Sequence, residues 1–191
     1  MRTVFPPLAV LFLVALPSSQ STATAGRLVL RLADLVSDAS TLVVGDVVAL
    51  RDVAGETVAE VRVVDLLKGE LPGDTLFYSA RPFSWDPGEP KLGERALLLL
   101  DSGEKFQGTR AFWKALDRLR AGRPFRPLAL GGYGRIPMIR RGEGGDPVVH
   151  LYDVILPPDV LAWVPEGVAS ESPQRLVDAA SLVEAVRRLS Q

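Results

Sequence analysis

Hydrophobic and charged positions alternate with a period of two over residues 59–66, apart from one shift, which is typical of a β-strand. Four short apolar runs, three of them rich in Val or Leu, lie near Gly, Pro or Asp, as strands usually do. We predict strands over residues 42–50, 57–67, 75–79 and 95–100, with a hairpin loop around Gly55. The last run reads RALLLL, and a run this uniformly apolar is expected to be buried on both faces of a sheet.

The second of these runs changes its apolar side. Val61 and Val63 alternate with charged residues, but Val64 and Leu66 then occupy the face that carried the charges. A β-bulge between Val63 and Val64 adds one residue and accounts for the switch. Gly45 interrupts the preceding strand, where glycine usually marks a bend, a bulge or a close backbone approach. Strands bent in this way are typical of small closed barrels.

The connection between the second and third strands contains two glycine-based turn signals. Pro72-Gly73 suits the central positions of a type II turn, because Pro presets φ and Gly accepts a positive φ. Lys68-Gly69 directly follows the second strand, and two interpretations of it stay open. Lys68 is either a charge that ends the strand and discourages edge pairing, or a ligand contact in a loop.

A period of 3.6 residues predicts three helices. We expect a short helix within residues 26–39, a middle helix over residues 109–121, and a terminal helix that a capping box opens at Ser181, with Glu184 as its second member. Ser172-Pro173 offers an earlier start for the terminal helix. Their apolar positions are Leu32, Leu35, Val36 and Ala39; Phe112, Leu116 and Leu119; and Leu182, Val183, Val186 and Leu189. Two more strands, over 135–140 and 148–155, are expected to form a C-terminal hairpin.

The first 25 residues have the parts of a secretory signal peptide. Residues 8–16 form an apolar run too short to cross a bilayer as a helix, and Ala23 and Ala25 mark a cleavage site before Gly26. No cysteine follows the run, which excludes a bacterial lipoprotein anchor, and no later run reaches membrane-spanning length. The expected location of the mature chain is therefore the periplasm or the extracellular space.

The amino-acid composition and the net charge exclude several classes of functional site and partner. The chain has no cysteine, which excludes thiol catalysis, zinc ribbons and iron–sulfur clusters. The formal net charge is −1, and loss of Arg2 with the signal peptide makes it −2 (−1 − 1). A nearly neutral protein has no global field that draws it to nucleic acid or anionic lipid. Arginine far outnumbers lysine, as is common in bacteria with GC-rich genomes.

Few residues offer catalytic or metal-binding chemistry. His150 is the only histidine, which rules out a His-rich zinc site, and its strand position is expected to face solvent. Neither a nucleophile elbow nor a phosphate-binding glycine motif is present in the sequence. We expect no catalytic residue, no metal and no cofactor. Four carboxylates around the connection between the third and fourth strands form the basis of an alternative, a hydrolase or a calcium site: Asp86, Glu89, Glu94 and Asp101.

Two groups of residues are candidates for binding a ligand or a partner protein. Phe83 and Trp85 lie in the Pro/Gly-rich loop 81–94, where aromatic residues favour recognition, or else cap the open end of a barrel. Arg123 and Arg126 belong to the densest basic stretch, which suits either an anionic partner or a solvated helix end. The candidate binding residues are thus Phe83, Trp85, Lys68, Arg123 and Arg126.

Three stretches resemble a group of uncharacterised secreted bacterial proteins: ADLVSDASTLVVGDVVAL, VAEVRVVDLLKGELPGDTLFY and GERALLLL. In that group a strand pair ends in a Leu-Lys-Gly turn, and a Gly-Glu step precedes an apolar strand. Their barrel is similar to the OB-fold of tissue inhibitors of metalloproteinases and netrin-like domains. The resemblance covers residues 33–100 and implies a fold. The inhibitory mechanism of the animal proteins does not carry over, because it needs an N-terminal cysteine where this chain would have Gly26.

These observations predict a mainly β fold, a single OB-like β-barrel domain over residues 26–191 with a short N-terminal helix, a middle helix, and a C-terminal hairpin and helix. The expected function is that of an exported, non-enzymatic binding or interaction protein whose partner is a protein or an extracellular ligand. Two alternatives stay open. One is a hydrolase that uses the acidic cluster on an extracellular glycan or ester, and the other is a structural protein of the cell envelope.

Overall fold

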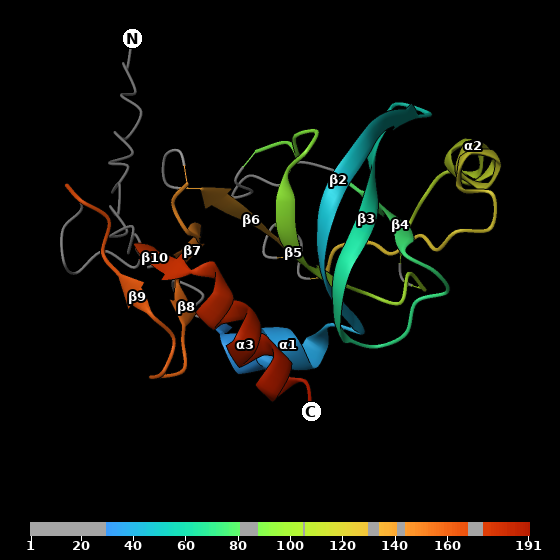
Figure 1. Ribbon diagram of the computed structural model, residues 1–191. Coiled ribbons are helices and arrows are strands. Elements are labelled where there is room, and N and C mark those ends of the chain that lie inside the picture. Colours follow the sequence, from blue (N-terminus) through green and yellow to red (C-terminus); the bar gives the residue numbers. More distant parts are fainter. Residues whose placement is uncertain (1–29, 81–87, 105, 130–133, 141–143, 168–173) are drawn as a thin grey trace, which may run out of the picture.

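The computed structural model of the protein describes residues 30–80, 88–104, 106–129, 134–140, 144–167 and 174–191. Within these ranges the fold is mainly β, with three α-helices (Figure 1). No helix in the described ranges is long and apolar enough to cross a membrane. The elements in chain order are β1 (Leu30–Arg31), α1 (Leu32–Asp38), β2 (Thr41–Val53), β3 (Glu56–Lys68), β4 (Thr75–Ser79), β5 (Arg95–Leu100), α2 (Arg110–Arg120), β6 (Arg135–Arg140), β7 (Pro147–Tyr152), β8 (Val154–Ile155), β9 (Ala162–Trp163), β10 (Gln174–Asp178) and α3 (Ala179–Leu189).

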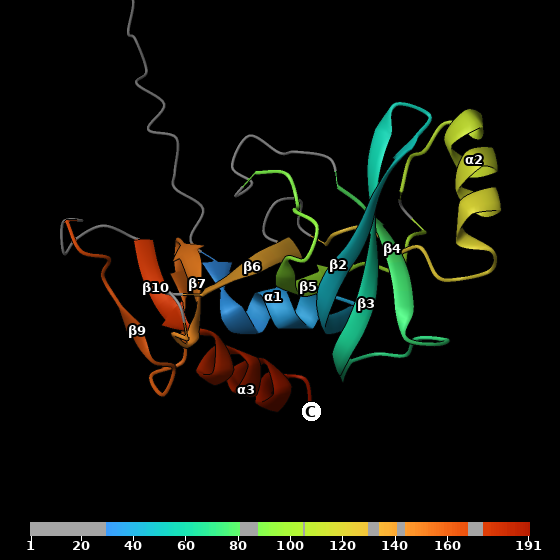
Figure 2. The ribbon, with the colours of Figure 1, turned by 45° about the horizontal axis from the view of Figure 1, so that its top comes forward.

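Eight strands form one antiparallel sheet in the order β4-β3-β2-β5-β6-β7-β10-β9, and β1 pairs separately with β8 in parallel. The half made of β4, β3, β2 and β5 is strongly curled, and β6, β7, β10 and β9 extend to the other side (Figure 1). Helices α1 and α3 lie side by side against one face, and α2 stands outside β4 (Figure 2). The four strands predicted in the front half are all present.

The bulge predicted in the second strand is confirmed. In the register of β2 and β3, Val44 pairs with Asp65 and Gly45 pairs with Val63, so that Val64 is the additional residue. Two further register shifts occur in the same strand pair. A Cβ atom on Gly45 would lie only 2.4 Å from a side-chain carbon of β3. This glycine is therefore required by the close approach of the two strands.

The turn between β3 and β4 also follows the sequence signals. Gly73 has a φ of +102°, as the third position of a type II turn requires. Gly69 has a φ of +81°, and a Cβ atom there would lie 2.5 Å from the carbonyl oxygen of Ser40. Both its backbone conformation and its surroundings exclude a side chain. The structure thus explains why a glycine is needed at position 69, and the explanation involves no ligand.

Three hydrophobic clusters form the core, and the first two share the strands β2 and β5. Leu42 and Val44 pack towards α1 and α3, whereas Val43 and Val47 pack into the curled half of the sheet. The leucines of β5 divide in the same way, which confirms that this strand is buried on both faces. A third cluster lies beneath α2 on the outer side of β3 and β4. Its buried members are Val53, Val58, Phe77, Phe112, Leu116 and Phe125.

Residues 124–129 run between β4 and β5 without forming a regular strand. On the β4 side this segment exchanges two backbone hydrogen bonds with Phe77, of 2.8 and 2.9 Å. On the β5 side it makes two more, with Asp101 and Leu99, both of 2.9 Å. One edge of β5 therefore pairs with β6 and, near its end, with residues 124–129. The regular strands in the described ranges do not themselves close into a barrel, and they leave β4 and β9 at the edges.

The C-terminal region differs from the prediction. Helix α3 begins at Ala179, because Asp178 is its N-cap and accepts a hydrogen bond of 2.7 Å from the backbone N–H of Ser181. The predicted opening at Ser181 is therefore wrong. The earlier start at Ser172-Pro173 is wrong as well, because residues 174–178 form β10, a strand that the sequence pattern does not predict.

Two other boundaries need correction. The strand predicted over residues 148–155 is two strands, β7 and β8, separated at Asp153, whose φ of +56° turns the chain. The helix predicted within residues 26–39 begins at Leu32, because the two preceding residues pair with β8. The predicted middle helix is α2, and Thr109 caps it by accepting a hydrogen bond from the backbone of the first turn.

Candidate binding surfaces

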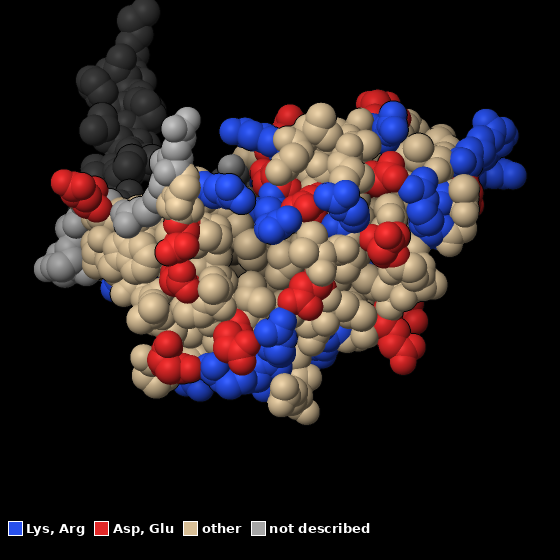
Figure 3. Space-filling model, viewed as in Figure 1, with Lys and Arg blue, Asp and Glu red and all other residues tan. Residues whose placement is uncertain are grey.

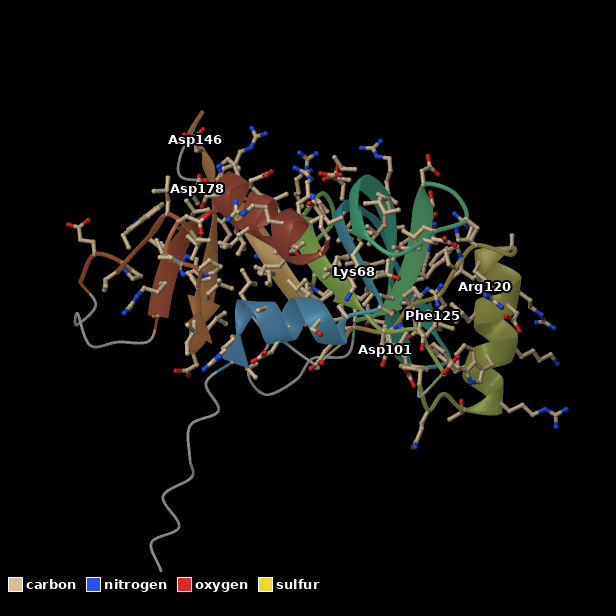
Figure 4. The ribbon with its side chains drawn as sticks, turned by 90° about the horizontal axis from the view of Figure 1, so that it is seen from below. Lys68, Asp101, Arg120, Phe125, Asp146 and Asp178 are labelled. Atoms are coloured by element: carbon tan, nitrogen blue, oxygen red, sulfur yellow. The ribbon has the colours of Figure 1, made fainter. Side chains whose placement is uncertain are left out.

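Lys68 is the last residue of β3, and its side chain reaches the C-terminal end of α1 (Figure 4). Its ammonium group donates hydrogen bonds to the carbonyl oxygens of Val36 at 2.8 Å and Ser37 at 3.1 Å. Carbonyls in the last turn of a helix lack partners within the helix, and the helix dipole favours a cation there. Lys68 therefore has a structural role, and a contact with a ligand stays a prediction.

Arg123 and Arg126 are both held by contacts within the protein. The guanidinium group of Arg123 forms an ion pair with Glu60 and lies 4.6 Å from the ring centroid of Phe77. Arg126 donates a hydrogen bond of 2.6 Å to the carbonyl oxygen of Ser102. Both arginines tie the segment after α2 to neighbouring parts of the chain, and their role as partner contacts stays a prediction.

The aromatic candidates and one of the acids lie outside the residues that the structure describes: Phe83, Trp85 and Asp86. The residues on either side of this segment are held in place. Ala80 donates a backbone hydrogen bond of 2.8 Å to Thr57 at the start of β3. The carbonyl oxygen of Gly88 accepts a hydrogen bond from the buried side chain of Arg135.

Glu94 and Asp101 do not have the spacing of a catalytic pair. They lie at opposite ends of β5, and a rise of about 3.3 Å per residue separates them by roughly 20 Å, whereas the paired acids of glycosidases are about 5–10 Å apart. Glu94 forms an ion pair of 2.6 Å with Arg135, whose side chain is 1% exposed. It also accepts a hydrogen bond from the backbone N–H of Lys91, so it organises the turn before β5. Glu89 is exposed.

His150 faces solvent, as the strand pattern predicts. It lies on β7 opposite Leu176 of β10, and its ring Nδ1 is 3.4 Å from the side-chain nitrogen of Gln174. Across the described ranges, no three His, Cys, Asp or Glu side chains come together as a metal site would require.

A charged group that the sequence analysis does not identify spans three strands of the curled half. Asp46 of β2 lies opposite Arg62 of β3 on one side and Arg95 of β5 on the other. Arg95 donates to both carboxylate oxygens at 2.7 and 3.0 Å, and Arg62 donates at 3.3 Å. We call this group the Arg62–Asp46–Arg95 ladder. The hydrogen bond from Arg95, aided by the charges of both arginines, lowers the pKa of Asp46 although burial opposes the shift.

The ladder lies on the outer wall of the curled half. Asp46 is 16% exposed, whereas the side chains of Arg62 and Arg95 are 62% and 48% exposed. Figure 3 shows basic and acidic side chains mixed over this face, with no extended region of one sign. The wall therefore presents local hydrogen-bond donors and acceptors rather than an extended electrostatic potential of one sign.

Comparison with known proteins assigns no family. The chain matches no protein-family model and no curated protein. Its function is therefore argued from the fold and from these surfaces.

Proposed function

We propose that the protein is an exported, non-enzymatic interaction protein built on an OB-like barrel, and that it binds a partner protein through the Arg62–Asp46–Arg95 ladder. The observation that supports the barrel is the hydrogen bonding of residues 124–129 to both β4 and β5. This segment connects two strands that the sheet leaves apart. It supports a closed ring in the order β4, β3, β2, β5 and residues 124–129.

The directions within this ring agree with a five-stranded Greek-key barrel of the OB type. Residues 124–129, which we call the closing segment, are parallel to β4 where Phe77 faces Phe125 and antiparallel to β5 where Leu100 faces Leu128. Residues of all four strands fill the interior of the ring, and Leu128 packs against them from the closing segment. The bulge at Val64 favours closure too, because bulges increase the bend and twist of a strand.

The face that OB-folds usually use for ligands is covered in this protein. OB-folds bind oligonucleotides and oligosaccharides across their second and third strands, which correspond here to β3 and β4. Helix α2 packs on the outer side of these strands, with Phe112 and Leu116 fully buried (Figure 2). The exposed wall that remains is the one that carries the Arg62–Asp46–Arg95 ladder.

The ladder has the chemistry of a protein contact. Arginine is enriched at protein interfaces, where its planar group pairs with carboxylates. Two guanidinium groups share the single carboxylate of Asp46, so the ladder carries a net charge of +1 and retains N–H donors for an acidic group on a partner. The expected partner is therefore a protein that presents Asp or Glu side chains to this wall.

The test is quantitative capture from a cell-envelope extract with the tagged protein. Replacing both arginines, Arg62→Gln with Arg95→Gln, removes both positive charges and keeps polar side chains on the sheet. The matched control is Arg188→Gln on α3, whose side chain is 47% exposed and forms a surface ion pair. We expect the wild type and the control to capture the same protein and the double variant to lose it. Equal capture by the double variant, or no reproducible partner, would contradict the proposal.

Two further measurements address the remaining parts of the proposal. Capture by a Phe83→Ala, Trp85→Ala variant tests the aromatic candidates separately from the ladder. N-terminal sequencing of the protein from the periplasmic or secreted fraction tests export, and we expect Gly26 as the first residue. A chain that retains Met1 and stays in the cytoplasm would remove the exported part of the proposal.

A further inference from the structure

The exposed side of α2 carries a row of basic residues that have no partner among the residues described by the structure. Arg110, Lys114 and Arg118 follow one another at intervals of four residues, which places them on one face of the helix. All three are exposed. None of their side chains forms an ion pair or hydrogen bond with any other part of the described chain. We call these three residues the α2 basic row.

The acidic residue of α2 itself does not compensate this row. Asp117 is the only acidic residue of the helix, and it forms an ion pair of 2.7 Å with Arg120. Arg123, just beyond the helix, is paired with Glu60. The formal net charge of the whole chain is only −1, so the α2 basic row is a local concentration of positive charge that the overall composition hides.

Helix stability does not explain the α2 basic row. Like charges four residues apart on a helix repel one another, and the row contains two such pairs. Arg110 is the first residue of α2, where the helix dipole disfavours a cation, and the first turn contains no acidic residue. Only Arg118, in the last turn, has the sign that the dipole favours. The repulsion therefore involves all three charges, and the helix dipole opposes one of them, Arg110.

We propose that the α2 basic row binds the headgroups of an anionic phospholipid membrane surface. Helix α2 stands at one extremity of the molecule, outside β4, and does not lie in a layer between other elements (Figures 1 and 2). The space-filling view shows basic side chains projecting at this end (Figure 3). At a rise of about 1.5 Å per residue the row is straight and about 12 Å long, so all three charges can meet one flat surface. This inference does not depend on the proposed partner protein.

A membrane surface fits the α2 basic row better than a single-stranded nucleic acid does. Proteins that hold single-stranded nucleic acids usually combine a basic groove with aromatic rings on which the bases stack. Here the aromatic rings near α2 pack against one another between the helix and the sheet, with centroids 5.0–5.8 Å apart. The row itself stands on the convex side of a single helix. Phospholipid headgroups need only an exposed basic surface. The electrostatic attraction between the two falls off within a Debye length, so the charges must be able to approach the membrane closely.

Co-sedimentation with lipid vesicles tests the proposal. The purified protein is mixed with vesicles of phosphatidylcholine alone or of equimolar phosphatidylcholine and phosphatidylglycerol. We expect binding to the anionic vesicles that weakens as salt is added. Each charge removed should weaken binding about fivefold, so Lys114→Gln should cost about fivefold and the triple change at Arg110, Lys114 and Arg118 to Gln about a hundredfold. The melting temperature of the triple variant should be equal to or higher than that of the wild type, because its helix loses repulsion.

Controls separate the row from other causes of binding. Arg140→Gln on β6 removes an exposed arginine elsewhere and should leave vesicle binding unchanged. Binding through the apolar residues 8–16 would be equal for neutral and anionic vesicles and insensitive to the row. Equal binding of the triple variant and the wild type would overturn the proposal. So would a wild type that ignores anionic vesicles but binds soluble dextran sulfate through the row, because the row would then serve a linear polymer.

Discussion

Lys68 connects the end of β3 to the end of α1, and its contribution to stability is measurable. We expect Lys68→Met to lower the free energy of unfolding by about 1–2 kcal/mol, because two helix carbonyls lose a charged donor. Lys91→Met is the matched control, since Lys91 is exposed and its side chain has no partner within the described ranges. Urea unfolding of both variants measures the difference. Equal effects of the two changes would show that the α1 contact contributes nothing.

Asp46 should make the stability of the protein depend on pH in the acid range. The pKa of its carboxyl is lowered from the ordinary value of 3.8, chiefly by the hydrogen bond from Arg95. The ionised group therefore stabilises the fold above its unfolded pKa, and this contribution is lost as the pH falls through the folded pKa. We expect the stability difference between the wild type and Asp46→Asn to be largest near neutral pH and to shrink below about pH 4.

Urea unfolding at a series of pH values measures this difference. In an Arg95→Gln background the same Asp46→Asn change should have a weaker pH dependence, because the main cause of the shift is gone. A wild-type-to-Asn difference that stays constant from neutral pH to pH 3 would contradict the assignment.

Single residues in this sequence are easier to identify than their partners. Asp46 is conspicuous as the one charge in the run LVVGDVVAL, which signals a position turned away from the core. Its partners, however, depend on the register of β3 and β5 against β2, and a shift of one residue would turn other side chains to this face. The bulges in the β2–β3 pair alter that register three times. The ladder could therefore not be derived from spacing alone.

Elements were predictable where the local pattern decides the structure. The bounds of β4, β5 and β6 agree with the prediction, and the parity change near Val64 located the bulge correctly. β10 is not predicted because its last residue, Asp178, and the nearby Ser181 are both good helix caps, so the stretch reads as the start of a helix. The closing segment was missed because Pro124 and Pro127 lack N–H groups, so the segment cannot form a regular ladder and does not look like a strand.

The proposed closure of the curled half by residues 124–129 makes a prediction about hydrogen exchange. Within residues 124–129 the amides of Arg126 and Ala129 donate to the carbonyls of Phe77 and Leu99, at 2.8 and 2.9 Å. Leu128 has no backbone acceptor in the described structure. We expect the first two amides to be protected about as well as those in β4 and β5, and the amide of Leu128 to exchange much faster. Residue-resolved exchange by NMR measures this. Equal, fast exchange along the whole segment would show that the ring is open.

At the scale of the whole molecule, the two halves of the sheet cannot be separated without exposing a shared strand. β5 packs Leu97 and Leu99 into the cluster under α1 and α3, and Leu98 and Leu100 into the curled half. The same division holds along β2. The resemblance over residues 33–100 stops at β5, so it indicates the curled half and not the strands that extend the sheet beyond it. That extension depends on pairings between distant residues, such as β7 with β10, which local patterns do not reveal.

This sharing of strands predicts that the protein unfolds in one transition. If either half lost its structure alone, two leucines of β5 would become exposed, and each buried leucine contributes about 2 kcal/mol. With the residues of β2 that divide between the same two clusters, the free energy lost approaches the whole stability of a typical domain, about 5–15 kcal/mol, so partly unfolded forms should be rare.

Trp113 on α2 and Trp163 on β9 report on opposite ends of the sheet (Figure 1). Fluorescence of variants that each retain one of these tryptophans, with Phe at the other two tryptophan positions, should give the same urea midpoint and slope. Separate midpoints would show that the halves are independent units and that the shared strands do not couple them.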